Sequence, residues 1–131
     1  VIFPGMQTDV KPFFSAMDIY MMSSSFEGLP IALLEAMSME CAVVSTNAGG
    51  VKEVIRNRKD GLICDVDKWE NLGDLCDLLI KNPLLLKQYK KSSRERVVEC
   101  FSLTTMVGAL EKIYLSLSTD MKNNSSKEVL W

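Results

Sequence analysis

Short apolar runs and longer segments with helical spacing follow one another along the chain. Apolar runs without polar interruption are typical of parallel strands buried on both faces, and we expect them at residues 1–3, 19–24, 41–46 and 62–65. Apolar residues three and four positions apart predict helices at 10–17, 31–37, 51–57, 68–81, 84–100 and 103–117. This alternation predicts an α/β fold, a Rossmann-like parallel sheet flanked by helices.

Several helix boundaries are marked by polar residues. Thr8 or Asp9 is expected to cap the first helix, and Ser102 the last. Asp67, with Glu70 three residues later, predicts a capping box. The helix that follows carries an apolar face of Leu72, Leu75, Cys76 and Leu79. The last helix is expected to pack into a core through Met106, Val107, Leu110, Ile113, Tyr114 and Leu117.

The turn at residues 26–30 joins an apolar strand to an apolar helix. Pro30 is expected at the first helical position, where its missing N–H has no cost. The free amides of a first helical turn and the positive end of the helix dipole form an anion site that suits a diphosphate. Glu35 lies five residues further on, roughly 7 to 8 Å along the axis, where its carboxylate can accept from both hydroxyls of a ribose. Glu27 would then face a group beyond the second phosphate, and a sugar there would offer it hydroxyls.

Other interpretations of the two glutamates remain open. The helix at 31–37 is apolar almost all round, so we expect it to be buried on most sides, and Glu35 would need a partner there. That partner could be a nearby Lys or Arg instead of a ligand. Glu27 could be an ordinary solvated turn residue. Paired carboxylates also hydrolyse glycosides, although a strand, turn and helix with an anion site favour a phosphate ligand.

Composition excludes several classes of function. The 131 residues are 47% hydrophobic, which suits one domain or part of one. A net charge of -2 argues against a nucleic-acid surface. The absence of His excludes Ser-His and Cys-His catalytic pairs and imidazole metal sites from these residues. We expect no metal at Asp65 and Asp67, because Asp67 is better explained as a cap.

The cysteines and the basic residues indicate where in the cell the protein is expected. The four cysteines lie apart in apolar stretches, which is typical of reduced core thiols in a cytoplasmic protein: Cys41, Cys64, Cys76 and Cys100. No apolar run reaches membrane-spanning length, so a soluble protein is expected. The helix at 84–100 carries a basic cluster that could contact a partner or anionic lipid at the inner face of a membrane, or form a solvated face with Glu95 and Glu99. The cluster consists of Lys87, Lys90, Lys91, Arg94 and Arg96.

An ordered series of motifs resembles one enzyme family. Glu27 and Glu35 stand eight apart around Gly28-Leu29-Pro30, and they are followed by residues 42–50, Glu53-Val54-Ile55 and residues 60–63. The series resembles the C-terminal nucleotide-sugar domain of GT-B glycosyltransferases, in particular the retaining, metal-independent group 1 enzymes (family 4-like). The resemblance implies that Glu27 acts on the donor sugar as the catalytic residue and that Glu35 binds the ribose. It further implies substrate contacts at Met6, Gln7, Ser24, Gly28, Leu29, Pro30 and Ile31, with Met6 and Gln7 near the base.

The same resemblance implies how the sheet is ordered. In the family order 3-2-1-4-5-6, the four strands expected here would be strands 3 to 6. Strands 1 and 2 would precede Val1 and lie between the first and second strands of this chain, which therefore cannot pair unless the sheet rearranges. We accordingly expect residues 1–118 to be a partial nucleotide-sugar-binding domain of a longer protein, and residues 119–131 to be a polar, disordered tail.

The implied function is that of a hexosyltransferase-type enzyme. This part would bind a nucleotide diphosphate-sugar, and the intact enzyme would move the sugar to an acceptor with retention of anomeric configuration, without a cofactor. The acceptor, a sugar, a lipid-linked molecule or another compound, would bind a missing N-terminal domain. The fragment alone is expected to be inactive. A non-catalytic α/β interaction domain and a GT-B-type nucleotide-sugar epimerase are the alternatives.

Overall fold

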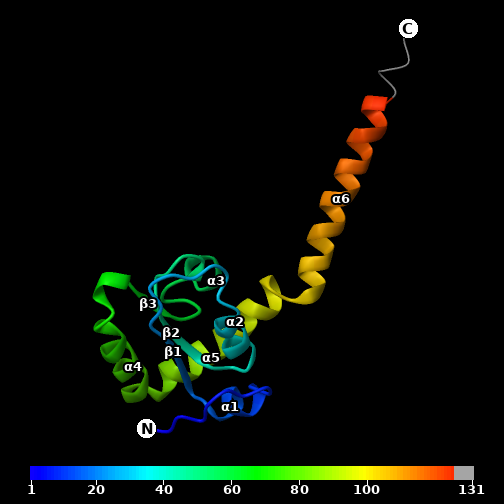
Figure 1. Cartoon of the computed structure of the whole chain (residues 1–131). Coiled ribbons are helices and arrows are strands. Elements are labelled where there is room, and N and C mark those ends of the chain that lie inside the picture. Colours follow the sequence, from blue (N-terminus) through cyan, green and yellow to red (C-terminus); the bar gives the residue numbers. More distant parts are fainter. Residues whose placement is uncertain (126–131) are drawn as a thin grey trace. The chain divides into compact units, whose positions relative to one another are not determined.

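The computed structural model describes the backbone of residues 1–125 and the side chains of residues 1–118. The chain forms two compact units, residues 1–98 and the residues from 99 onward. Figure 1 traces the order of the elements along the chain.

The first unit is built on a parallel sheet of three strands. These are β1 (Ile19–Met22), β2 (Ala42–Thr46) and β3 (Leu62–Cys64), in the spatial order β1-β2-β3. Ile19 pairs with Ala42, and Val44 pairs with Leu62. All five residues of β2 are buried, as expected for a central strand with both faces covered. The predicted parallel α/β fold is confirmed, and the order agrees with the last three strands of the arrangement that the resemblance implies.

Helices cover both faces of this sheet. On one face, α4 (Asn71–Lys81) and α5 (Pro83–Cys100) close a core of Ala42, Val44, Leu62, Leu72, Leu79 and Tyr89. α2 (Ile31–Ser38) lies on the opposite side of the sheet from α4 (Figure 1). Its buried residues are Leu33, Ala36 and Met37. Because Leu72 and Leu79 of α4 lie in the core on the other face, the predicted apolar face of α4 is confirmed.

Leu79 offers a direct test of this core. Its side chain is 0% exposed, whereas the neighbouring Leu78 is 42% exposed. We expect Leu79→Ala to lower the free energy of unfolding by about 2–5 kcal/mol, because it removes buried methyl groups and leaves a cavity. Leu78→Ala, the matched control, should change it far less. Urea denaturation followed by circular dichroism measures both, and equal losses would contradict the assigned core.

The predicted strand at residues 1–3 is wrong. This segment has no strand structure, and Ile2 and Phe3 are each 90% exposed. A buried strand requires a neighbouring strand to satisfy its backbone, and the sheet as described begins at β1, which pairs with β2. Apolar composition alone therefore could not make this segment a strand.

Three predicted helix starts or lengths also differ. α1 (Lys11–Ala16) begins after Val10, although the Asp9 carboxylate does accept the Lys11 N–H at 3.2 Å. The capping box is wrong, because Asp67 lies inside a 3-10 turn, η1 (Val66–Lys68), and α4 starts only after Glu70. α3 (Val51–Val54) is a single turn, since the chain becomes extended at Ile55.

The second unit contains one long helix, α6 (Leu103–Ser125). The expected cap is confirmed, because the Ser102 hydroxyl accepts the Thr105 N–H at 3.2 Å. The helix continues beyond the predicted end at Leu117, into the polar tail expected from residue 119. The rest of that tail, residues 126–131, lies outside the described residues. Within this unit by itself, the apolar side chains for which core packing was expected are exposed: Met106, Val107, Leu110, Ile113, Tyr114 and Leu117.

Candidate functional site

The turn after β1 holds the Glu27 carboxylate in place. The Ser24 hydroxyl, expected to contact the substrate, donates to Glu27 Oε1 at 2.6 Å. The Thr46 hydroxyl, at the end of β2, donates to the Ser24 carbonyl at 2.5 Å. Glu27 is half-buried, and its Oε2 accepts no hydrogen bond from the described residues. One carboxylate oxygen of Glu27 therefore keeps its capacity to accept a hydrogen bond from a ligand hydroxyl.

Two glycines bring the turn after β2 against the Glu27 turn. The Gly50 N–H donates to the carbonyls of Gly28 at 3.1 Å and Glu27 at 3.4 Å. A Cβ on Gly49 would lie 1.8 Å from the Glu27 carbonyl oxygen, and φ is +48° there. A Cβ on Gly50 would lie 2.2 Å from the Gly28 carbonyl oxygen. Both positions therefore require glycine for the two backbones to meet, a contact that the sequence did not distinguish from an ordinary turn.

The start of α2 differs from the prediction by one residue. Pro30 is the N-cap and Ile31 the first helical residue. No side chain caps this end, so the amides of Ile31 and Ala32 have no side-chain acceptor among the described residues. Gly28, Leu29 and Ile31 are exposed beside it. This helix end is open to an anion.

Glu35 is exposed, which corrects the expectation of a helix buried on most sides. Only one side of α2 packs on the sheet, so Ile31, Ala32 and Glu35 share the uncovered side. An apolar sequence does not determine which residues another element covers. Among the described residues, no Lys or Arg forms an ion pair with Glu35. The ion-pair interpretation of Glu35 is therefore not supported.

Glu35 lines a hollow of about 270 Å³ beside the loop that precedes α1. The other lining residues are Thr8, Asp9, Val10, Lys11, Phe14, Ser38 and Met39. Met6 and Gln7, the expected base contacts, are not among them: Met6 is 97% exposed, and the Gln7 amide donates to the Pro4 carbonyl at 2.7 Å. Residues 8–10 of the loop and the first residue of α1 line the hollow together with Glu35. From the sequence, this segment was predicted only to cap a helix.

Tyr20 links the two glutamates electrostatically. Its ring lies edge-on to Phe14 of the hollow, with 5.7 Å between ring centroids. Burial raises the pKa of Tyr20, and the negative charges of Glu27 and Glu35 raise it further. Both carboxylates therefore act on one phenol. This effect could not be predicted from the sequence, in which Tyr20 resembles any aromatic residue of a buried strand.

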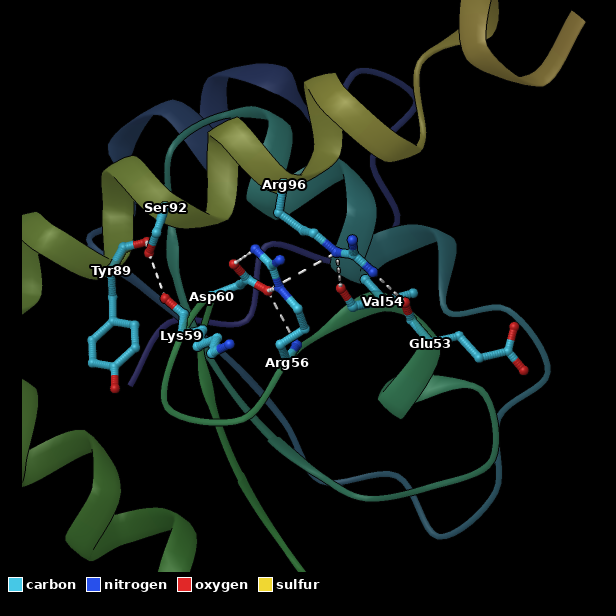
Figure 2. Close-up of polar contacts among 8 residues, drawn as sticks. All are labelled: Glu53, Val54, Arg56, Lys59, Asp60, Tyr89, Ser92 and Arg96. Carbon is cyan, nitrogen blue, oxygen red and sulfur yellow. Dashed lines mark hydrogen bonds and ion pairs between the residues drawn. The ribbon is translucent and has the colours of Figure 1, made fainter. Parts of the chain in front are cut away.

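A cluster of charged side chains surrounds the buried side chain of Asp60, which is 1% exposed (Figure 2). Arg56 donates to both of its oxygens, from Nε at 2.6 Å and Nη2 at 2.7 Å. Arg96 Nε lies 3.9 Å from Asp60 Oδ2, and its Nη2 donates to the Glu53 carbonyl at 3.1 Å. The sequence did not predict this cluster, because Arg96 lies far along the chain from Arg56 and Asp60, which are four residues apart.

Side chains of the predicted basic cluster on α5 contact different partners within the protein. The side chain of Arg96 is only 18% exposed and points into the unit, toward Asp60. Lys90 pairs with Asp18 at 2.8 Å, and Lys91 with Glu95 at 3.7 Å. Arg94 donates to the Ser38 carbonyl. Several of the predicted cluster's charges therefore have protein partners.

The described residues hold no group of three or more His, Cys, Asp or Glu side chains that could bind a metal ion. All four cysteines are free thiols, and burial raises the pKa of Cys41, Cys64 and Cys76. At neutral pH these three thiols are protonated and poorly nucleophilic. None of the described helices combines the length and apolar character needed to cross a membrane.

Comparison with known proteins places this arrangement among sugar-transferring enzymes. The chain is 31% identical over 123 residues to N-acetyl-alpha-D-glucosaminyl L-malate synthase of Bacillus anthracis, covering 94% of this chain and 32% of that protein. It is 30% identical over 115 residues to alpha-maltose-1-phosphate synthase of Mycolicibacterium smegmatis, covering 83% and 30%. The chain thus spans about a third of the length of these relatives.

Solved structures and a family match agree with these relatives. The C-terminal domain of the group 1 glycosyl transferase LpcC from Francisella tularensis has a TM-score of 0.69 at 25% identity, covering 79% of this chain and 53% of that one. The Anabaena protein HepE, solved with UDP, has a TM-score of 0.82 at 19% identity, covering 87% and 32%, a likeness of fold. Residues 1–96 match the family described as glycosyl transferases group 1. With the GT-B type of fold and the Glu27 turn described above, this chain belongs to the group 1 glycosyl transferases.

Proposed function

We propose that this chain is the donor-binding part of a glycosyltransferase that moves a hexose from a nucleotide diphosphate-sugar to an acceptor with retention. The observation that carries the proposal is the exposed Glu35 carboxylate, which lines a hollow about one helical turn from the uncapped start of α2. A ribose on Glu35 leaves the diphosphate at the helix start. The sugar then reaches Glu27.

Each part of the donor has a chemical counterpart in this arrangement. The hollow beside residues 8–11 takes the base, and Glu35 accepts hydrogen bonds from the two ribose hydroxyls. The amides of Ile31 and Ala32 and the dipole of α2 stabilise the negative diphosphate, including the charge that develops on it as a leaving group. Glu27 holds the sugar hydroxyls and stabilises the positive charge that develops at the anomeric carbon.

The rest of the reaction is assigned to the full-length protein, because this chain spans about a third of its relatives. We propose that the acceptor, a sugar, a lipid-linked molecule or another compound, binds outside these residues. The 131 residues alone bind donor weakly and transfer nothing. No metal or cofactor is required, and the enzyme works in the cytoplasm, with the exposed lysines of α5 available to the inner face of a membrane.

Calorimetric titration of the full-length protein with UDP-, GDP- and ADP-sugars tests the proposal. We expect saturable binding of one donor class, and a product whose anomeric proton keeps the donor's configuration in the NMR spectrum. No saturable binding would favour a non-catalytic interaction domain. Conversion of the nucleotide-sugar without an acceptor would favour an epimerase, and an inverted product would contradict retention.

A further inference from the structure

The Glu27 turn is hydrogen-bonded to the residue that precedes α3, a helix of only four residues. The N-cap of α3 is Gly50, whose N–H donates to the carbonyls of Gly28 and Glu27. A single helical turn is unstable by itself, because its few hydrogen bonds do not offset the entropy lost in forming it. The position of Gly50 therefore depends on contacts that hold α3 from outside.

Arg96 of α5 holds the other end of α3. Its Nη2 donates to the Glu53 carbonyl at 3.1 Å, and its Nε donates to the Val54 carbonyl at 3.4 Å (Figure 2). A cation at the C-terminal end of a helix is also favoured by the helix dipole. Arg96 thus fixes α3 at one end while Gly50 meets the Glu27 turn at the other.

Asp60 forms an ion pair with Arg96. Its buried carboxylate lies 3.9 Å from Arg96 Nε and accepts from the Arg56 side chain and from the Arg56 N–H at 3.2 Å. The Arg56 side chain is 48% exposed, whereas that of Arg96 is 18% exposed. A charge as buried as that of Arg96 is held in place by its opposite charge more firmly than an exposed one is.

We propose that Arg96 and Asp60 are positioning residues for the sugar end of the donor site, acting through α3 and Gly50 on the Glu27 turn. This inference rests on the proposed function. The chain of contacts runs from Asp60 to Arg96, to the carbonyls that end α3, and from the Gly50 amide to Glu27 and Gly28. It includes none of the residues that line the hollow beside Glu35.

The two ends of the donor should therefore respond differently when the network is weakened. A nucleoside monophosphate depends on the Glu35 hollow, whereas the nucleotide-sugar also depends on the Glu27 turn. Loss of Arg96 contacts should weaken recognition of the nucleotide-sugar and leave the monophosphate almost unaffected. A role in stability alone would not separate these two affinities.

Arg96→Lys in the full-length protein makes the test, because lysine keeps the charge but cannot reach two carbonyls and a carboxylate together. We expect the affinity for the nucleotide-sugar to fall about tenfold, since misplacing a positioned group by a fraction of an ångström is costly, and that for the monophosphate to change less than about twofold. Hydrogen exchange at the Gly50 amide should become faster. Leu72→Ala, in the core on the α4 side, is the control: it should lower stability without changing the affinity ratio or Gly50 exchange.

If Arg96→Lys fails to fold, Asp60→Asn makes the same test with side-chain shape retained. Unchanged Gly50 exchange and an unchanged affinity ratio in the variants would overturn the inference, as would an equal change in Leu72→Ala. If the unaltered protein binds no nucleotide-sugar, the proposed function fails. The exchange measurement then still decides whether Arg96 and Asp60 position the turn.

Discussion

Gly49→Ala is expected to destabilise the protein by about 3 kcal/mol or more and to abolish measurable donor binding, because two backbones can no longer meet. The new Cβ would lie 1.8 Å from the Glu27 carbonyl oxygen, a backbone atom that cannot move without moving the turn. The φ of +48° adds strain for any residue with a side chain. Urea denaturation and donor titration of the full-length protein measure the two effects.

Gly73→Ala is the matched control for this substitution. Gly73 lies in α4, and a Cβ there would meet nothing within 4 Å. Alanine should therefore stabilise the helix by about 0.5–1 kcal/mol and leave donor binding unchanged. If Gly49→Ala changed stability and donor binding no more than Gly73→Ala does, the close contact assigned between the two turns would be contradicted.

Glu27→Gln should lower kcat/KM of the full-length enzyme by about 10²–10³-fold, because it removes the negative charge that faces the developing positive charge on the sugar. In the unaltered protein the Ser24 hydroxyl donates to Glu27 Oε1 at 2.6 Å. Glutamine keeps the shape of the side chain, and its amide oxygen can still accept this hydrogen bond. The fold should therefore be retained. The loss should appear mainly in kcat, since the charge matters most in the transition state.

Ser24→Ala separates the charge of Glu27 from its position. This variant keeps the carboxylate but removes the hydroxyl that orients it, so a smaller loss of about tenfold is expected. Steady-state kinetics with saturating acceptor compares the two variants. Activity of Glu27→Gln within twofold of the unaltered enzyme would show that Glu27 has no catalytic role.

Local sequence patterns predicted the elements that local forces determine. The uninterrupted apolar run of β2 indicated a central strand, and the spacing of Leu72 and Leu79 indicated which side of α4 is buried. α5 begins at Pro83, one residue before the predicted start, because Asn82 ends α4 and proline suits the first position of a helix. In the site, the apolar run from Ile19, then Gly28 and Pro30, were enough to indicate a strand, a turn and a helix.

Contacts between distant segments could not be predicted in this way. Burial of residues 1–3 needs a neighbouring strand, and burial of Glu35 needs a covering element, neither of which a local pattern reveals. The cluster of Asp60 and Arg96 joins residues 36 positions apart. Tyr20 and the loop at residues 8–11 reach the site only through the packing of α1, β1 and α2. Polar residues with these roles look like ordinary surface or turn residues in the sequence.

In the proposed function, Glu35 binds the ribose of a nucleotide whose diphosphate lies at the start of α2. A double-mutant cycle between protein and ligand tests it, with titration of a nucleoside diphosphate and its 2′,3′-dideoxy analogue against the full-length protein and its Glu35→Gln variant. Glu40→Gln, an exposed glutamate just beyond α2, is the control.

We predict that removal of the two hydroxyls weakens binding to the unaltered protein and to Glu40→Gln about tenfold, since a carboxylate accepts from both. In Glu35→Gln the same removal should weaken binding much less, because the partner of the diol is already altered. An equal loss in the unaltered protein and in Glu35→Gln would show that Glu35 does not contact the ribose and would contradict the proposed donor site.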